Sequence, residues 1–231
     1  MEMLILYFLF AFGVIIVPRY IRYKGSDYKN ASGNNFLKII FNKGNYGEFL
    51  TFNKLEKISG YKKLMTNLYI PREDGSTTEI DLIMISETGI YVFESKNYSG
   101  WIFGDEKQKY WMQTLKNGQK NRFFNPIWQN HEHISALKSV IKIGDMNLYK
   151  SYIVFSERCT LKKINIASNN VKVIKRDSLL KYINRDMLES ERILNVEKIN
   201  NIYEKLERYC HADDKLKQAH INNIKLKSND M

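Results

Sequence analysis

The sequence predicts an α/β fold in which a mixed central β-sheet is flanked by helices and preceded by an N-terminal transmembrane helix. Two observations predict it: an apolar run opens the chain, and the patterns that follow alternate between helical and strand periods in the order typical of such a sheet. Of the 231 residues, 44% are hydrophobic and 13% aromatic, which excludes a disordered chain. The net charge of +11 favours a polyanionic partner, either nucleic acid or an anionic bilayer.

The apolar run covers residues 3–17 and contains no charged side chain, whereas Pro18 and Arg19 follow it directly. A secretory signal carries its positive charge ahead of the apolar region, so a membrane anchor is favoured. The run is shorter than the roughly 20 residues that span a bilayer, but thin membranes tolerate such a mismatch. We therefore expect a single-pass anchor at residues 1–23, with the C-terminal domain on the cytoplasmic side of the cell membrane. The alternatives are a buried helix of the domain and a cleaved signal.

Composition divides the rest of the chain into three parts. Residues 24–43, rich in Lys, Asn, Gly and Ser, are expected to form a tether, residues 44–210 a folded domain, and residues 211–231 a polar tail. The two cysteines, Cys159 and Cys210, provide neither a disulfide framework nor the spacing of a zinc site. A reducing compartment fits this cysteine usage.

The first elements of the domain follow from apolar periodicity. Apolar residues at steps of three over 46–59 predict an amphipathic helix that ends at Gly60. Three runs rich in Ile, Leu, Val, Tyr and Met, separated by turn signals, predict an antiparallel meander. These runs cover residues 63–70, 79–86 and 89–96. The last two are apolar at both odd and even positions, so we expect both faces of that hairpin to be covered.

Residues 97–124 are more polar and are expected to form a hairpin or a loop excursion. Asn125 and Pro126 then supply an N-cap and a first helical residue, which predicts a helix through about Ile143. Two further strands and two closing helices are expected at residues 152–155, 171–174, 177–183 and 190–209.

The hairpin formed by the last two strands of the meander carries charged residues among apolar ones. If a two-residue turn joins the strands, Asp81 lies opposite Glu94. The same register places Lys96 opposite Glu79. A three-residue loop with a bulge at Gly89 would instead make the two carboxylates diagonal neighbours. Either register brings Asp81 and Glu94 close together.

Opposed carboxylates destabilise a sheet unless a cation lies between them. Mg²⁺ prefers oxygen ligands from one or two carboxylates and keeps water and phosphate oxygens in its other positions. Beside such an ion, Lys96 would orient or help to deprotonate an attacking water and stabilise charge on a phosphorus centre. The alternative is a plain ion pair between Lys96 and Glu79, with Asp81 as a strand-entry residue.

Further motifs agree with the first interpretation. In chain order they are Gly47-Glu48, Glu79-Ile80-Asp81, Gly89-Ile90-Tyr91-Val92-Phe93-Glu94-Ser95-Lys96-Asn97, Gly100, Trp111 and Asn125-Pro126-Ile127-Trp128-Gln129. This set resembles the NERD domain, the nuclease-related domain, over residues 44–143. NERD proteins are often single-pass bacterial membrane proteins and are similar to the PD-(D/E)xK nuclease superfamily. The resemblance therefore implies a restriction-endonuclease-like fold.

The resemblance also implies roles for individual residues. Asp81 and Glu94 would ligate Mg²⁺ or Mn²⁺, with the carbonyl of Ser95 as a third ligand. Lys96 would be the catalytic lysine, and Glu48 resembles the extra acidic residue of related sites. The superfamily has proline before the aspartate where this chain has isoleucine, and the residues after 143 match no motif of the family.

Gln129, in the first turn of the helix that Asn125 and Pro126 open, is similar to a glutamine found beside related nuclease sites. Contacts with nucleic acid are expected at Lys96, Asn97, Lys120 and Arg122, and the alternative for the basic run that holds the last two is a solvated surface. His131 and His133, two apart on this helix, face roughly opposite sides and are interpreted as solvent-facing. The three tryptophans are expected in the core or at its rim, and they are Trp101, Trp111 and Trp128.

Together these observations predict a membrane-anchored, metal-dependent nuclease that hydrolyses phosphodiester bonds of DNA. One alternative is a non-catalytic module that binds nucleic acid or a protein partner at the cytoplasmic face of the membrane. Another is a structural protein whose basic charge serves anionic lipid.

Overall fold

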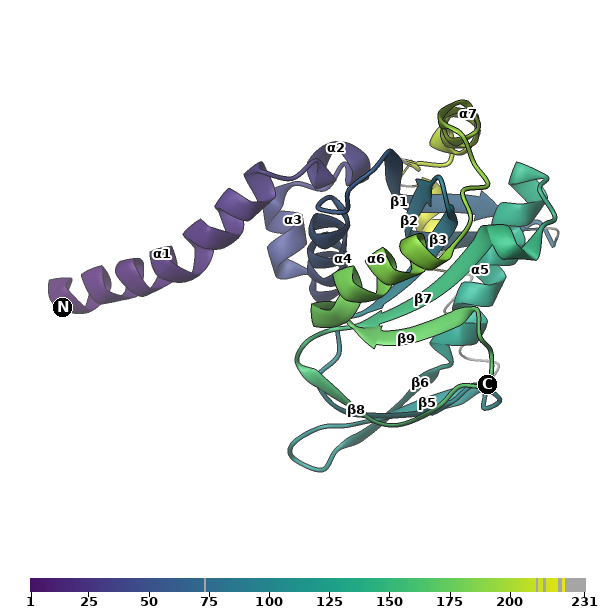
Figure 1. The fold of residues 1–231 in the computed structure, drawn as a ribbon. Helices are drawn as coiled ribbons and strands as arrows, with labels where there is room; N and C mark the ends of the chain where they lie inside the picture. Colours follow the sequence, from purple (N-terminus) through teal and green to yellow (C-terminus); the bar gives the residue numbers. More distant parts are fainter. Residues whose placement is uncertain (73, 211, 214, 220–221, 223–231) are drawn as a thin grey trace.

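The computed structural model of the protein describes residues 1–72, 74–210, 212–213, 215–219 and 222 (Figure 1). The helices are α1 (Glu2–Lys24), α2 (Tyr28–Ser32), α3 (Phe36–Phe41), α4 (Lys43–Leu55), α5 (Pro126–Ile141), α6 (Leu179–Glu189) and α7 (Val196–Glu207). Two 3₁₀ turns are η1 (Met146–Leu148) and η2 (Arg176–Ser178). The strands are β1 (Lys62–Pro71), β2 (Thr77–Ser86), β3 (Gly89–Lys96), β4 (Gly100–Asp105), β5 (Tyr110–Thr114), β6 (Lys120–Phe124), β7 (Tyr149–Phe155), β8 (Cys159–Asn165) and β9 (Val171–Lys175).

A five-stranded mixed sheet forms the centre of the fold, with strand order β1-β2-β3-β7-β9. The pairs β1–β2 and β2–β3 are antiparallel, whereas β3–β7 and β7–β9 are parallel. Ser86 pairs with Gly89 across the tip of the β2–β3 hairpin. The predicted meander and its two-residue turn are therefore confirmed, and the alternative with a glycine bulge is excluded.

Helices cover both faces of this sheet (Figure 1). On one face, Ile85 and Ile90 pack into a core with Leu137 of α5 and Ile199 of α7. On the other, the alternate side chains of β2 and β3 pack against α2, α4 and α6. The hairpin is thus buried on both faces, as predicted, which is why its strands are apolar at odd and even positions alike.

A second, four-stranded sheet has the order β6-β5-β4-β8, and its β4–β8 pair is parallel. Three of its strands occupy the segment expected to be a hairpin or loop, and β8 was not predicted. These strands are five to seven residues long and largely half-exposed. They bury a small core that includes Ile102 and Trp111. The predicted fold class is therefore wrong on this point: the protein contains two mixed sheets.

The predicted transmembrane helix is also wrong. Within the part of the chain that the structure describes, no helix is long and apolar enough to cross a membrane. The 15-residue apolar run of α1 is about 22 Å long at 1.5 Å per residue, against a hydrocarbon core of roughly 30 Å. The helix reaches its full length only by continuing through Pro18 into a basic segment. This finding overturns the anchor at residues 1–23, its contact with the membrane and the single-pass localisation.

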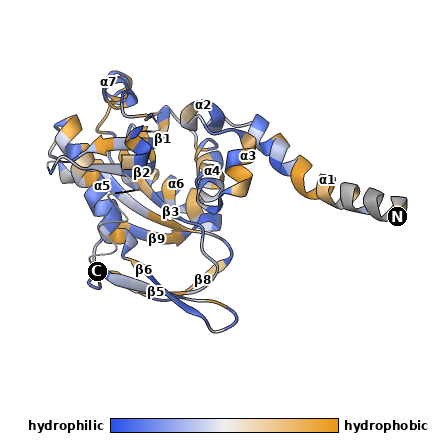
Figure 2. Cartoon of the chain, turned by 180° about the vertical axis from the view of Figure 1, so that it is seen from behind, coloured by the Kyte–Doolittle hydropathy of each residue, from blue (hydrophilic) through white to orange (hydrophobic). Residues whose placement is uncertain are grey.

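The helix α1 projects away from the sheets (Figure 1), and its middle part is coloured as hydrophobic in Figure 2. The segment that follows, expected as a tether, contains α2 and α3. Its Tyr28 and Ile39 are buried, and the ring of Tyr28 lies 5.5 Å from that of Phe49 in α4. Most of the predicted tail, residues 211–231, lies outside the described residues. The predicted domain boundaries stay a prediction.

Candidate active site

Asp81 lies where the β2–β3 ladder ends. The last paired residues of the two strands are Leu82 and Phe93, one step before the carboxylates. There the Oδ2 atom of Asp81 accepts a hydrogen bond of 2.9 Å from the backbone N–H of Ser95. The hydroxyl of Thr66 in β1 donates to the Asp81 carbonyl at 2.6 Å. Both strands next to β2 therefore fix Asp81, and the carboxylate bonds to the strand that carries Glu94.

Glu94 is 2% exposed, and both of its carboxylate oxygens are paired. Its Oε1 lies 2.6 Å from the Nζ of Lys96, and its Oε2 lies 3.0 Å from the Nε2 of His133. A buried carboxylate requires such partners, because its charge is otherwise costly away from water. Lys96 thus forms its ion pair with Glu94, two residues away on the same strand, and not with Glu79 as the alternative reading expected.

The helix α5 brings Gln129 to the same place. The Nζ of Lys96 donates to Gln129 Oε1 at 3.0 Å. Asn125 caps α5 as predicted, since its Oδ1 accepts from the N–H of Ile127 at 2.9 Å. Its Nδ2 also donates to three carbonyl oxygens of the β4–β5 turn. The cap therefore anchors the first turn of α5, which presents Gln129 to β3.

His133 belongs to this region, although the sequence predicts that it faces solvent. It is buried, so that prediction is wrong, whereas His131 is exposed as predicted. An ionised carboxylate only accepts hydrogen bonds, so we assign the proton to Nε2 facing Glu94, and Nδ1 then accepts from the hydroxyl of Thr78 at 2.8 Å. His133 lies four residues after Gln129, on the same face of the helix. That spacing was the available signal.

Glu48, on the helix α4, adds a further carboxylate to this region. The hydroxyl of Tyr28 donates to its Oε2 at 3.4 Å. Burial, together with the negative charges of Glu79 and Glu94, raises the pKa of Glu48 to about 8. Burial and the charges of Glu94 and Glu48 likewise raise the pKa of Asp81 well above its usual value. These acidic groups are therefore close enough to oppose one another's ionisation.

For the ion pair between Glu94 and Lys96, the pKa shifts favour the charged forms. Burial alone would raise the pKa of Glu94, but Lys96 and His133 outweigh it and lower that pKa. Burial would lower the pKa of Lys96, but Glu94 and Asp81 outweigh it and raise that pKa. Lys96 and Glu94 are therefore held in their charged forms.

The predicted nucleic-acid contacts separate in space. Asn97 follows β3, and its Nδ2 donates to the carbonyl of Lys43 at the start of α4. Lys120 and Arg122 are exposed on β6 of the other sheet. The guanidinium of Arg122 stacks over the ring of Tyr110 at 4.5 Å. The structure therefore brings Asp81, Glu94, Ser95, Lys96, Gln129 and Glu48 into one region, with Asn97 beside it and the other two residues elsewhere.

The donor chemistry of this region fits a hard divalent cation. Its carboxylates repel one another, and oxygen atoms are the ligands that Mg²⁺ and Mn²⁺ prefer. Among the described residues, no three His, Cys, Asp or Glu side chains are grouped closely enough to hold an ion by themselves. Mg²⁺ is usually bound by one or two carboxylates together with water and substrate phosphate, so this arrangement agrees with its coordination habit.

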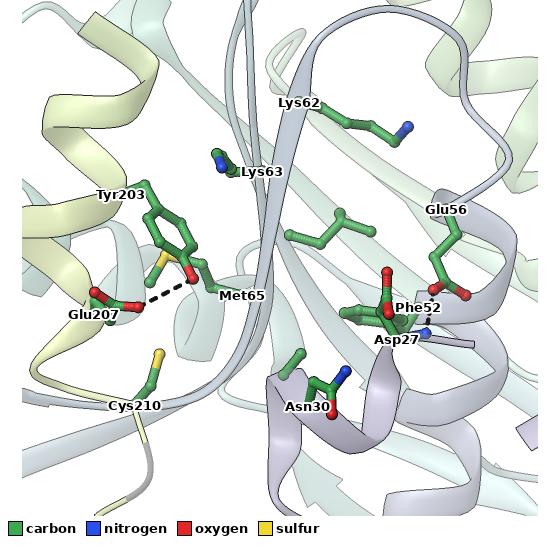
Figure 3. A pocket seen from close by; sticks show the side chains of 12 residues that line it. Asp27, Asn30, Phe52, Glu56, Lys62, Lys63, Met65, Tyr203, Glu207 and Cys210 are labelled. Atoms are coloured by element: carbon green, nitrogen blue, oxygen red, sulfur yellow. Dashed lines mark hydrogen bonds between the residues drawn. The ribbon is translucent and has the colours of Figure 1, made fainter. Parts of the chain in front are cut away.

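A cavity with a volume of about 460 Å³ lies elsewhere, between β1, α2 and α7. Figure 3 shows Tyr203 and Glu207 on one side of it and Asp27 and Glu56 on the other. None of the predicted site residues lines this cavity. The cavity is therefore separate from the carboxylate site.

Comparison with known proteins identifies the family. The chain is 34% identical to an uncharacterized protein of Bacillus anthracis over 182 residues, which cover 78% of this chain and 82% of the relative. No solved structure matches the chain. The model of the nuclease-related domain, NERD, matches residues 43–156, so the matched region extends past the helix at which the resemblance was expected to end. The chain belongs to the NERD family, and its Asp81, Glu94 and Lys96 lie within the nuclease-related domain.

Proposed function

We propose that the protein is a metal-dependent nuclease that hydrolyses phosphodiester bonds of DNA. The observation that carries this proposal is the convergence of β2, β3 and α5 on one buried ion pair. The Nζ of Lys96 lies 2.6 Å from the carboxylate of Glu94 and 3.0 Å from Oε1 of Gln129. The carboxylate of Asp81 accepts a hydrogen bond from the N–H of Ser95, on the strand that carries Glu94 and Lys96. Charged side chains are rarely placed in a strand that is buried on both faces unless chemistry requires them.

In this proposal, Asp81 and Glu94 hold a divalent cation together with the carbonyl of Ser95, and Glu48 completes the acidic side. When bound, such a cation polarises the scissile phosphate and favours ionisation of the attacking water. His133 keeps Glu94 ionised and fixes its orientation, as a neighbouring hydrogen-bond donor commonly does for a ligand.

Lys96 acts as a cation in this proposal. Its ammonium group is paired with Glu94 and donates to Gln129, so it is positioned before substrate arrives. A positioned positive charge stabilises the extra negative charge that the phosphate gains in the transition state. Gln129 accepts from Lys96 and thereby limits the directions in which the ammonium group points.

The test incubates the full chain with plasmid DNA and with single-stranded DNA in the presence of Mg²⁺ or Mn²⁺. We expect cleavage that EDTA abolishes, and a loss of about 10²- to 10³-fold in Asp81→Asn and in Lys96→Gln, because each removes one charge from the site. The matched control is Lys198→Gln, which removes an exposed charge from α7.

Cleavage that survives in both Asp81→Asn and Lys96→Gln would show that the site is wrong or that the activity belongs to a contaminant. If DNA is bound equally well with and without metal and no product forms, the protein is instead a non-catalytic nucleic-acid-binding module. Circular dichroism of each variant separates loss of activity from loss of folding.

A further inference from the structure

A second, strongly basic pocket lies beside the carboxylate site, at the end of β3. Its volume is about 230 Å³, far larger than the roughly 30 Å³ that one water occupies. Among the described residues, four cationic side chains and one carboxylate line it, which leaves an excess of three positive charges; they are Arg19, Lys43, Arg158, Arg176 and Glu157.

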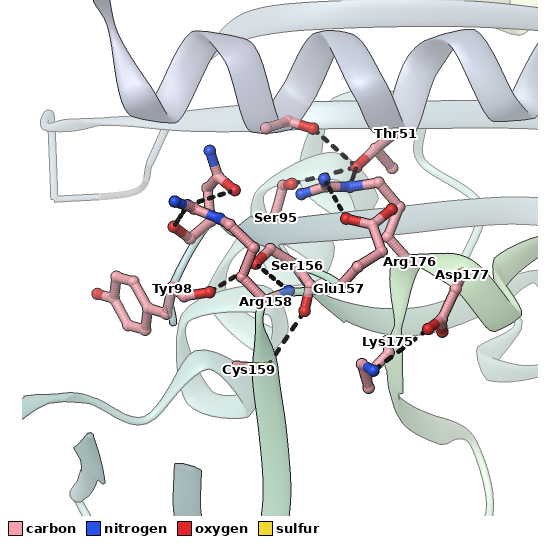
Figure 4. A network of polar contacts seen from close by, with 12 residues as sticks. Thr51, Ser95, Tyr98, Ser156, Glu157, Arg158, Cys159, Lys175, Arg176 and Asp177 are labelled. Carbon is pink, nitrogen blue, oxygen red and sulfur yellow. Dashed lines mark hydrogen bonds and ion pairs between the residues drawn. The ribbon is translucent and has the colours of Figure 1, made fainter. Parts of the chain in front are cut away.

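Arg176 is the buried group of this pocket, with 1% of its surface exposed. Its Nε donates to the hydroxyl of Thr51 at 3.2 Å, and its Nη1 donates to the carboxylate of Glu157 at 3.0 Å (Figure 4). Its Nη2 is buried and has no hydrogen-bond partner among the described residues. A buried N–H group of a charged side chain without a partner is unfavourable, and such groups commonly mark a place where a ligand binds.

The remaining residues give the pocket a defined shape. Arg158 Nη2 donates to both the carbonyl and the side-chain oxygen of Asn97, at 2.8 and 3.1 Å. Arg19 of α1 stacks over the ring of Tyr46, with 5.4 Å between its guanidinium carbon and the ring centroid. A Cβ atom on Gly47 would lie 2.8 Å from the Cβ of Asn97, so glycine is required for this close approach of α4.

Thr51 and Asn97 connect the pocket to the carboxylate site. Thr51, which accepts from Arg176, also lies 3.2 Å from the hydroxyl of Ser95 in the strand that carries Glu94 and Lys96 (Figure 4). Asn97, which lines the pocket, is the residue directly after Lys96. A phosphate held in the pocket would therefore belong to a nucleotide close to the phosphodiester bond that the carboxylate site is proposed to hydrolyse.

We propose that this pocket binds a phosphate group of the nucleic-acid strand on which the carboxylate site acts, with Arg176 Nη2 as a donor to a phosphate oxygen. The planar guanidinium fork matches phosphate geometry, and the excess positive charge compensates the anion. The first turn of α4, which contributes Lys43 and Tyr46, adds the positive end of its dipole. The identity of the strand rests on the proposed nuclease function, whereas the phosphate chemistry rests on the pocket alone.

The test measures binding to the full chain without divalent metal, so that no turnover is needed. Inorganic phosphate is titrated by calorimetry, and single-stranded oligonucleotides with a 5′-phosphate or a 5′-hydroxyl are titrated by fluorescence anisotropy. We expect phosphate to bind, and its affinity to fall about tenfold in Arg176→Lys and in Arg158→Gln. Because Arg158 is exposed, the second variant keeps the test valid if Arg176→Lys does not fold. Lys198→Gln, with the same charge change on α7, should bind as the unchanged protein does.

The proposal is overturned if the unchanged protein does not bind inorganic phosphate, or if both pocket variants bind phosphate and oligonucleotides as tightly as it does. If the protein prefers the 5′-phosphate and Arg158→Gln removes this preference, the pocket binds the phosphate at a strand end. If Arg158→Gln weakens the binding of both oligonucleotides equally, the pocket binds internal phosphates. Either result supports the proposal. Phosphate binding without any DNA cleavage would refute the nuclease proposal alone.

Discussion

The two sheets of the molecule differ in whether their charged side chains are buried or exposed. In the five-stranded sheet, β2 and β3 are covered on both faces, and the charged side chains near their ends are held by ion pairs and hydrogen bonds. In the four-stranded sheet, the basic side chains of β6 are exposed. A charge costs little in water but a great deal in a protein interior. A buried charged residue is therefore a far stronger indication of function than an exposed one.

For the proposed nuclease, the same contrast separates two modes of contact with a nucleic acid. Glu94 and Lys96 are fixed by side chains from two elements before any ligand arrives, which suits a group that acts on the reacting phosphate. If the protein binds DNA as proposed, the exposed lysine and arginine residues on β6 would instead add a sequence-independent attraction to phosphate that falls with salt. Variants of the first sheet should therefore change turnover, and variants of the second should change affinity and its dependence on salt.

Among variants that act on the carboxylate site through a neighbouring residue, we expect the largest loss of activity at His133. The variant His133→Leu removes the donor to buried Glu94, and we expect a loss of about 10- to 100-fold in metal affinity or activity. The measurement is the rate of DNA cleavage as a function of Mg²⁺ concentration. In His133→Gln, which keeps an N–H donor, part of the loss should be recovered.

His131→Leu is the matched control, because this neighbouring histidine of α5 is exposed. It should cleave DNA at the rate of the unchanged protein. Equal Mg²⁺ dependence in His133→Leu and His131→Leu would mean that Glu94 does not need its histidine partner. Failure of His133→Gln to recover any activity would indicate that the ring shape, and not the donated hydrogen bond, matters at this position.

A smaller effect on the same sheet concerns pH. The pKa of Glu48 is raised to about 8 in the folded protein, above its usual value of 4.5. Between these pH values the folded state binds more protons than the unfolded state, so the stability of the metal-free protein falls as pH rises. Glu48→Gln removes this loss. We expect its Tm to exceed that of the unchanged protein by about 3 °C or more at pH 8.5, since 1 kcal/mol shifts Tm by roughly 2–4 °C at this size.

The measurement is thermal unfolding in EDTA from pH 5 to pH 8.5. Glu204→Gln, the same substitution at an exposed position of α7, is the control and should unfold in parallel with the unchanged protein at every pH. Parallel curves for Glu48→Gln as well would show that Glu48 ionises normally in the folded state. Adding Mg²⁺ should raise the Tm of the unchanged protein most at high pH, because an ionised carboxylate is the ligand.

The sequence predicts the contacts that depend on local geometry. The two-residue turn and the strand period of two suffice to bring Asp81 and Glu94 together, and the Asn125 cap suffices to start α5. The prediction that His133 faces solvent is wrong, because helical spacing aligns it with Gln129 but does not say that this face meets β3. The distinction depends on how a helix and a sheet pack, which no local pattern encodes.

Arg176 shows the same limit over a longer distance. It lies 125 residues from Thr51 along the chain, and nothing in its sequence neighbourhood indicates that its guanidinium is buried beside α4. The helix α1 shows another limit: its apolar run predicts a membrane-spanning helix, but the helix continues through Pro18 into a basic segment and is not apolar enough over its length to cross a membrane. Sequence patterns therefore predicted the residues of one strand pair well and their long-range neighbours poorly.

The smallest expected effect lies on the four-stranded sheet and provides the other half of the comparison. Arg122→Ala should weaken DNA binding about equally for all sequences, and should reduce the slope of log affinity against log salt by about 1, because one phosphate contact is lost. The matched control is Arg185→Ala on α6. Both arginines are exposed and stack over a tyrosine ring, at 4.5 Å for Arg122 and 5.1 Å for Arg185. The rate of cleavage at saturating DNA should stay the same in both variants, since neither side chain contacts the buried ion pair. An unchanged salt slope in Arg122→Ala, or an equal drop of the slope in Arg185→Ala, would show that β6 is not part of the nucleic-acid interface.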